Sequence, residues 1–173
     1  MVDLDVDQGS MCIPGCLTVV PLDKAALSVE VGSVHFCHCL SPLTFVVSQT
    51  GFKYTTPLIY FHGYTHPKEN IELYRSLVTT LAARINDRLS RDLNARASGI
   101  VVNTNGWIDG EGFNLMLHTI QTLAIDVVLV VSHDKLYSTL GSALKATVWG
   151  SQVTVVKLPK SGGVVSKVRS GLL

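Results

Sequence analysis

Acidic side chains cluster at the start of the sequence. Asp3, Asp5 and Asp7 alternate with apolar residues, and Gln8 follows them. On an extended strand, residues two apart share a face, so these carboxylates would project together. A carboxylate at a strand end can hold Mg²⁺, directly or through water, and can accept a proton from an attacking hydroxyl group. A pair of solvated acids at a strand terminus would show the same spacing, so both interpretations stay open here.

A second candidate site is the stretch NTNGW at residues 103–107. Thr104 and Gly106 flank its centre, and glycine permits a sharp turn there. Trp107 on a loop offers a flat face on which a nucleobase can stack. The alternative is that Trp107 covers the local core as a lid.

A third loop, FHGYTHP at residues 61–67, follows another apolar run. Thr65 and the backbone amides of this loop could contact sugar or phosphate. His62 and His66 could act as acid or base, although polar surface is the more ordinary role of a loop histidine.

The cysteines raise the question of a zinc site. Cys12, Cys16 and the run HFCHC at residues 35–39 carry suitable ligand types. Their spacings match no common finger or ribbon, so buried thiols are the better interpretation.

Composition limits the class of protein. The chain has 173 residues, of which 47% are hydrophobic and 16% charged, and its formal net charge is +1. These values favour a folded domain with a buried core and exclude a broad electrostatic footprint for nucleic acid. The acidic N-terminus is unlike a signal peptide, and the longest strongly apolar run is far shorter than the roughly 20 residues of a membrane helix. We therefore expect a soluble intracellular protein without a membrane partner.

Strands and helices are expected to alternate along the chain. This order predicts an α/β fold with a mostly parallel sheet and flanking helices, whose ligands bind beyond the carboxyl ends of the strands. No G-x-x-x-x-G-K-[ST] loop occurs, so the chain by itself has no obvious cradle for ATP phosphates. The expected strands are residues 2–6, 57–61, 100–103, 126–132 and 153–158, with further candidates at 34–40 and 45–48, and the expected helices are 69–89, 112–124 and 134–144.

Taken together, these segments resemble a known family, the eukaryotic Clp-type polyribonucleotide 5′-hydroxyl kinases associated with pre-mRNA cleavage complex II and tRNA splicing. No single segment is decisive, but the set is specific and covers most of the chain in order. The similar segments are residues 3–10 with 13–15, 61–67, 70–74, 103–107, 126–130, 136–137 and 158–165.

The resemblance implies transfer of the ATP γ-phosphate to an RNA 5′-hydroxyl group, in mRNA 3′-end cleavage and polyadenylation or in tRNA processing in the nucleus. Asp5 would match the acid that supports Mg²⁺ and activates the hydroxyl, with Gln8 completing a D-x-x-Q pattern. Thr104, Gly106 and Trp107 would match a T-x-G-W clasp on the RNA 5′ end. The implied partners are RNA and subunits of these processing complexes.

The departures from the family pattern are also informative. Asp7 stands where the family has glycine, and the family's ATP-binding module with its phosphate-binding (Walker A) loop has no counterpart here. We therefore expect residues 1–165 to be a partial central kinase domain of P-loop-NTPase type, with an unmatched insertion near residues 33–50 and a divergent tail at 166–173. Both unmatched stretches could be translated intron sequence, which sequencing of the transcript would test.

Three functional hypotheses follow. The first is a member of the RNA kinase family that is catalytically incomplete in this form. The second is a non-catalytic interaction module of an RNA 3′-processing complex. The third is an unrelated small α/β domain that binds a mononucleotide.

Overall fold

The computed structural model describes residues 1–7, 11–22 and 57–163. The chain divides into two compact units, Met1–Thr122 and Leu123–Leu173. The expected strands at 34–40 and 45–48, the insertion near 33–50 and the tail at 166–173 lie outside the described residues.

A four-stranded sheet forms the centre of the first unit. Its strands are β1 (Val2–Asp3), β2 (Cys16–Val19), β3 (Leu58–Phe61) and β4 (Val102–Asn103), in the spatial order β3-β2-β1-β4. β1 pairs with β4 in parallel, and Asp3 lies opposite Asn103. β2 pairs antiparallel with both β1 and β3. The carboxyl ends of β1 and β4 therefore lie side by side, as ligand sites of α/β folds require.

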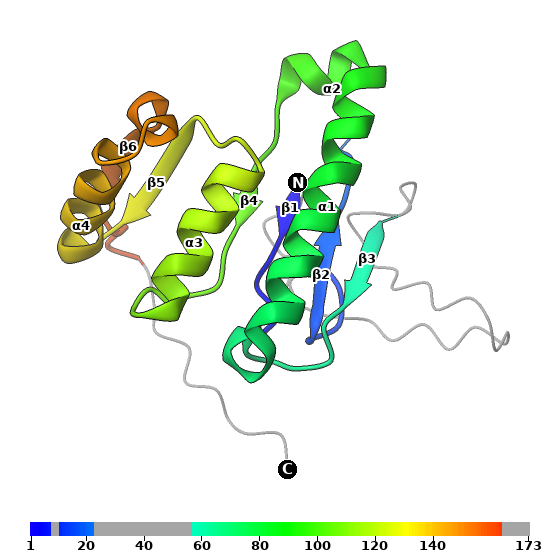
Figure 1. Cartoon of the computed structure of the whole chain (residues 1–173), viewed down its shortest axis with the longest axis horizontal. Coiled ribbons are helices and arrows are strands. Elements are labelled where there is room, and N and C mark those ends of the chain that lie inside the picture. Colours follow the sequence, from blue (N-terminus) through cyan, green and yellow to red (C-terminus); the bar gives the residue numbers. More distant parts are fainter. Residues whose placement is uncertain (8–10, 23–56, 164–173) are drawn as a thin grey trace, which may run out of the picture. The chain divides into compact units, whose positions relative to one another are not determined.

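Helices of the first unit are the 3-10 helix η1 (Pro67–Asn70), α1 (Ile71–Arg91), α2 (Leu93–Ser98) and α3 (Glu111–Thr122). α1 begins after Asn70, whose side chain accepts a hydrogen bond from the amide of Leu73. Its buried stripe recurs every three to four residues, as an amphipathic helix requires. Figure 1 shows α1 crossing β1 and β2 in this view. The buried stripe consists of Tyr74, Val78, Leu81, Ala82 and Ile85.

The second unit is a parallel strand pair with a helix. Its elements are β5 (Val127–Val131), α4 (Asp134–Lys145), the 3-10 helix η2 (Trp149–Gln152) and β6 (Thr154–Leu158). Leu140 and Leu144 of α4 are buried. Alternate residues of β5 remain exposed, namely Val127, Leu129 and Val131.

The predicted α/β class with flanking helices is confirmed, and its parallel pairings are β1 with β4 and β5 with β6. The sequence pattern does not predict β2, which gives this part of the sheet its antiparallel pairings. In the parts of the chain that the structure describes, no helix is both long enough and apolar enough to cross a membrane.

Candidate functional site

The acidic residues at the end of β1 are buried. Asp3 and Asp5 are each only 4% exposed, so the interpretation as a solvated pair is wrong. Asp3 Oδ1 accepts hydrogen bonds from Asn103 Nδ2 at 2.9 Å and from the amide of Asp5 at 3.1 Å. Asp5 Oδ1 accepts one from the amide of Asp7 at 3.1 Å. These bonds offset part of the cost of burying charge and fix the direction of the carboxylates.

Asp5 by itself does not make a complete metal site. Among the described residues, no group of three or more His, Cys, Asp or Glu side chains could hold a metal ion. Magnesium commonly takes only one or two protein carboxylates and fills its shell with water and substrate phosphates. Asp5 therefore fits Mg²⁺ only as one ligand among phosphates and waters, and Gln8 lies outside the described residues.

The two described cysteines are free and buried, as the thiol interpretation predicts. Burial and the neighbouring Cys12 raise the pKa of the Cys16 thiol to about 11. Cys16 therefore stays protonated near neutral pH. The HFCHC run at residues 35–39 lies outside the described residues.

Trp107 lies in the loop between β4 and α3. Its amide donates a hydrogen bond to Asn105 Oδ1 at 3.0 Å. A Cβ atom placed on Gly112 would lie 2.6 Å from the indole Cγ, so only glycine allows this packing. Trp107 thus covers the start of α3 and is still half-exposed, while Thr104 and Gly106 are exposed. The lid role and a stacking surface are compatible in this geometry.

The third candidate loop, residues 61–67, also contacts Trp107. The imidazole of His66 and the indole of Trp107 have centroids 5.1 Å apart. His66 Nδ1 also accepts a hydrogen bond from the amide of Lys68 at 3.1 Å, which caps η1. Thr65, the preceding residue, is exposed. The structure therefore places His66, the residue after Thr65, against Trp107. The sequence alone does not predict this contact.

His62 is buried, with 2% of its surface exposed, which contradicts its interpretation as polar surface. Its ring nitrogens face the backbone carbonyls of Tyr64 at 3.1 Å and Asn70 at 3.2 Å. The ring also packs edge-on against Tyr74, with centroids 5.7 Å apart. These contacts fix the loop to the start of α1.

Tyr74 is a site residue that the sequence analysis missed. Its hydroxyl donates a hydrogen bond to the carbonyl oxygen of Leu4 at 2.9 Å and accepts one from Asn105 Nδ2 at 3.3 Å. Burial raises the pKa of Tyr74, the carboxylates of Asp5 and Asp3 raise it further, and the Asn105 hydrogen bond opposes them. The hydroxyl therefore stays protonated and remains a donor. Two signals in the sequence point to Tyr74: it is the hydroxyl-bearing member of the apolar stripe of α1, and it ends the family-like segment 70–74.

Comparison with known proteins identifies the family of this chain. The family described as "mRNA cleavage and polyadenylation factor CLP1 P-loop" matches residues 1–171. A Protein CLP1 homolog of Arabidopsis thaliana is 39% identical over 97% of this chain and 33% of its own length. The Polyribonucleotide 5′-hydroxyl-kinase Clp1 of Bos taurus is 34% identical over 96% of the chain and 33% of its own length. The chain thus spans about one third of the length of these curated relatives.

Solved structures agree on the fold. A Clp1p–Pcf11p complex superposes with a TM-score of 0.71 at 22% identity, over 96% of this chain and 37% of that one. A structure of an extended interface between Pcf11p and Clp1p gives a TM-score of 0.69 at 19% identity, over 96% of this chain and 38% of that one. The resemblance inferred from the sequence is confirmed, and the chain belongs to the CLP1 P-loop family of mRNA cleavage and polyadenylation factors.

Proposed function

We propose that this chain is the acid-bearing and RNA-end-binding part of a polyribonucleotide 5′-hydroxyl kinase. The observation that carries the proposal is that one tyrosine, Tyr74, is hydrogen-bonded both to the Asp5 segment and to the Trp107 loop. A kinase of this class must hold an RNA end and an activating carboxylate in one geometry, because phosphoryl transfer depends on positioning and charge neutralisation.

Each candidate residue has a specific role in this proposal. Trp107 stacks on a base at the RNA 5′ end, and Thr104, Gly106 and Thr65 line the exposed loops beside it. Asp5 accepts the proton of the attacking 5′-hydroxyl group and supports Mg²⁺, assisted by Gln8.

ATP would supply the phosphoryl group, but this chain contains no phosphate-binding loop. Because the G-x-x-x-x-G-K-[ST] motif does not occur in the sequence, we assign no residue of this chain to the ATP phosphates. We therefore derive from this chain only the binding of RNA and the acceptance of a proton.

The cellular setting belongs to the same proposal. A relative of this chain is named as a polyribonucleotide 5′-hydroxyl kinase, and structural neighbours are Clp1p in complex with Pcf11p. We propose a nuclear protein that acts on RNA 5′ ends and assembles with subunits of an mRNA cleavage and polyadenylation complex or of a tRNA-splicing complex.

A second candidate is a non-catalytic scaffold in an RNA 3′-processing complex. It is favoured by Asp7, which puts a negative charge where the resembling family has glycine and where it would repel phosphate. In a full-length protein, Asp7→Gly should then raise kinase activity, whereas a scaffold would show none before or after the change.

The test is phosphorylation of a 5′-hydroxyl RNA oligonucleotide with Mg²⁺-ATP. The chain would be assayed alone and mixed with the part of a relative that carries the phosphate-binding loop, and RNA binding would be measured in parallel. We expect activity in the mixture, its loss in Asp5→Asn with RNA binding retained, and full activity in the surface control Asp87→Asn. RNA binding without phosphorylation in the mixture would support the scaffold, and absence of RNA binding would refute both the roles of Trp107 and the proposed function.

A further inference from the structure

The peptide unit just before Asp5 is held at both ends. Its oxygen, the carbonyl of Leu4, accepts the hydrogen bond of the Tyr74 hydroxyl at 2.9 Å. Its nitrogen, the amide of Asp5, donates to Asp3 Oδ1 at 3.1 Å. One residue earlier, the amide of Leu4 donates to the carbonyl of Asn103 at 3.0 Å. Because β1 ends at Asp3, the Tyr74 hydroxyl supplies the hydrogen bond that a neighbouring strand would otherwise donate to the Leu4 carbonyl. This bond limits the backbone conformations open to Asp5.

The same hydroxyl reaches the loop that carries Trp107. Tyr74 accepts from Asn105 Nδ2 at 3.3 Å, and the other end of that amide, Oδ1, accepts from the amide of Trp107 at 3.0 Å. A single side-chain amide thus links the tyrosine to the backbone of the tryptophan. In this way, three segments far apart in the sequence meet at one oxygen atom.

Packing leaves these groups little freedom to rearrange. The cavity behind them is only about 10 Å³ and is lined by Tyr74, Asn105, Trp107, Gly112 and other residues of the loop and α3. A space of this size is at the lower limit for one water molecule. Leu4 is fully buried, so water cannot replace the tyrosine hydroxyl. Loss of that hydroxyl would leave the Leu4 carbonyl without a hydrogen-bond donor.

We propose that Tyr74 is a positioning residue, whose hydroxyl and its partner Asn105 hold the Asp5 segment and the Trp107 loop in one fixed geometry. The consequence for RNA rests on the proposed function: an RNA end stacked on Trp107 is presented to the carboxylate at a set position. Tyr74 contacts neither RNA nor phosphate in this proposal, and it acts through the Leu4 peptide and Asn105.

The test uses the full chain with Trp149→Phe, which leaves Trp107 as the sole fluorophore of its kind. Tyr74→Phe removes only the hydroxyl, Asn105→Ala removes the amide bridge, and the two are also combined. Tyr60→Phe is the matched control, because Tyr60 is half-buried on β3 and its hydroxyl makes no hydrogen bond to the described residues. The readouts are acrylamide quenching of Trp107 and affinity for a 5′-hydroxyl single-stranded RNA oligonucleotide.

We expect Tyr74→Phe to increase the quenching of Trp107 and to weaken RNA binding by about 3- to 10-fold, the range of one hydrogen bond. For the quenching of Trp107, the double variant should show no larger effect than Asn105→Ala alone, because the Tyr74 hydroxyl is linked to the Trp107 backbone through Asn105. Tyr60→Phe should match the parent.

Two results would overturn the proposal. One is Trp107 quenching and RNA affinity in Tyr74→Phe that equal those of Tyr60→Phe. The other is a double variant whose effects on Trp107 quenching add, which would mean that the two residues act independently. If Tyr74→Phe failed to fold, Asn105→Ala would decide alone, since unchanged quenching in that variant would also refute the link.

Failure of the proposed function would look different. If the parent chain does not bind RNA, the RNA role is refuted. An increase of Trp107 quenching in Tyr74→Phe would still establish the positioning role.

Discussion

The imidazole of His66 lies against the indole of Trp107, with ring planes inclined by 57°. The two residues come from different loops, one before η1 and one before α3. His66 is itself held by its hydrogen bond to the amide of Lys68. The ring pair therefore joins two loops that each carry a predicted RNA contact, so His66 supports one side of Trp107.

His66→Ala should weaken binding of single-stranded RNA by about 0.5–1.5 kcal/mol, the range for one aromatic pair. The variant removes the ring that restricts Trp107, so the indole would adopt more orientations in the free protein. Fluorescence titration with an RNA oligonucleotide measures the effect.

The matched control for this variant is His133→Ala. His133 caps α4 through its Nδ1, as His66 caps η1, but it lies in the second unit. Equal RNA affinities in the two variants would show that the His66 ring does not support Trp107.

Trp107→Ala should weaken single-stranded RNA binding by about 1–3 kcal/mol, because stacking on one aromatic ring contributes that much per base. Affinity measured by anisotropy of a labelled RNA is the readout, and Trp149→Ala is the control for loss of an indole elsewhere. If RNA affinity did not change, Trp107 would be a lid over the start of α3 and nothing more.

Gly112→Ala should displace Trp107 without deleting it. The added methyl group, in the first turn of α3, would overlap the backbone oxygen of Trp107 and lie 2.6 Å from its indole Cγ, so both the ring and the backbone of Trp107 have to move. We expect a shifted Trp107 emission maximum in the Trp149→Phe background and weaker RNA binding.

Gly141→Ala is the corresponding control, because a methyl group at Gly141 of α4 meets no atom within 4 Å. That change should leave Trp107 emission unaltered and stabilise α4 by about 0.5–1 kcal/mol. Unaltered emission in Gly112→Ala as well would contradict the close packing of the ring.

Patterns local in the sequence explain which parts of this site could be predicted. The spacing of apolar residues predicts α1, and the rule that ligands bind beyond parallel strands directs attention to Asp5 and Trp107. β2 escapes prediction because Pro14 and Gly15 look like breakers. Gly15 in fact has φ of 85° and accepts hydrogen bonds from the amides of His62 and Gly63, so it forms a turn into the strand.

The links between the loops could not be predicted from the sequence. Helical periodicity assigns Tyr74 to the core, but only tertiary structure brings its hydroxyl to Leu4, 70 residues away. The contact of His66 with Trp107 likewise joins residues that share no local pattern. The sequence therefore indicates which residues can do chemistry. The role of Tyr74 in connecting them becomes visible only in the structure, where α1 packs on the sheet.

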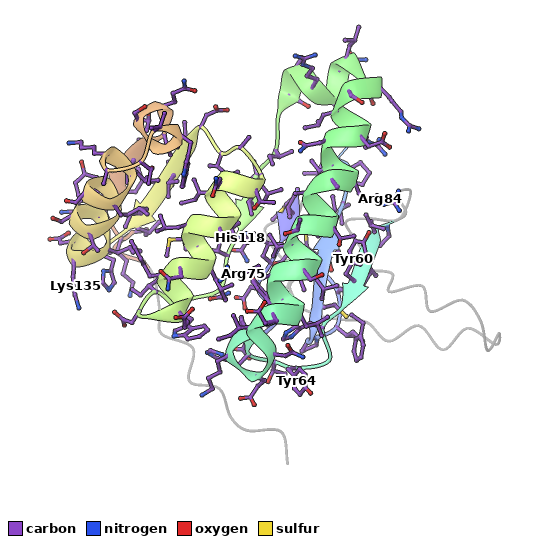
Figure 2. All side chains as sticks on the ribbon, in the orientation of Figure 1. Tyr60, Tyr64, Arg75, Arg84, His118 and Lys135 are labelled. Carbon is purple, nitrogen blue, oxygen red and sulfur yellow. The ribbon has the colours of Figure 1, made fainter. Side chains whose placement is uncertain are left out.

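His118 makes stability depend on pH. It lies on α3 beside Arg75 of α1 (Figure 2), and its Nε2 is 3.2 Å from Thr79 Oγ1 of α1, while Thr122 lies next to it on its own helix. Burial lowers the pKa of His118 below 6.5, and the charge of Arg75 lowers it further.

Because this pKa is lower in the folded state, the unfolded chain takes up a proton that the native protein does not when the pH falls below about 6.5. The contribution of His118 to stability is therefore complete above that pH and is lost as the pH falls toward the pKa in the folded state. His118→Gln keeps a hydrogen-bonding side chain and removes the titration, so its urea midpoint should fall less between pH 7 and pH 5 than that of the parent. Equal pH dependence in His118→Gln and the parent would show that the Arg75–His118 contact does not govern the acid response of the first unit.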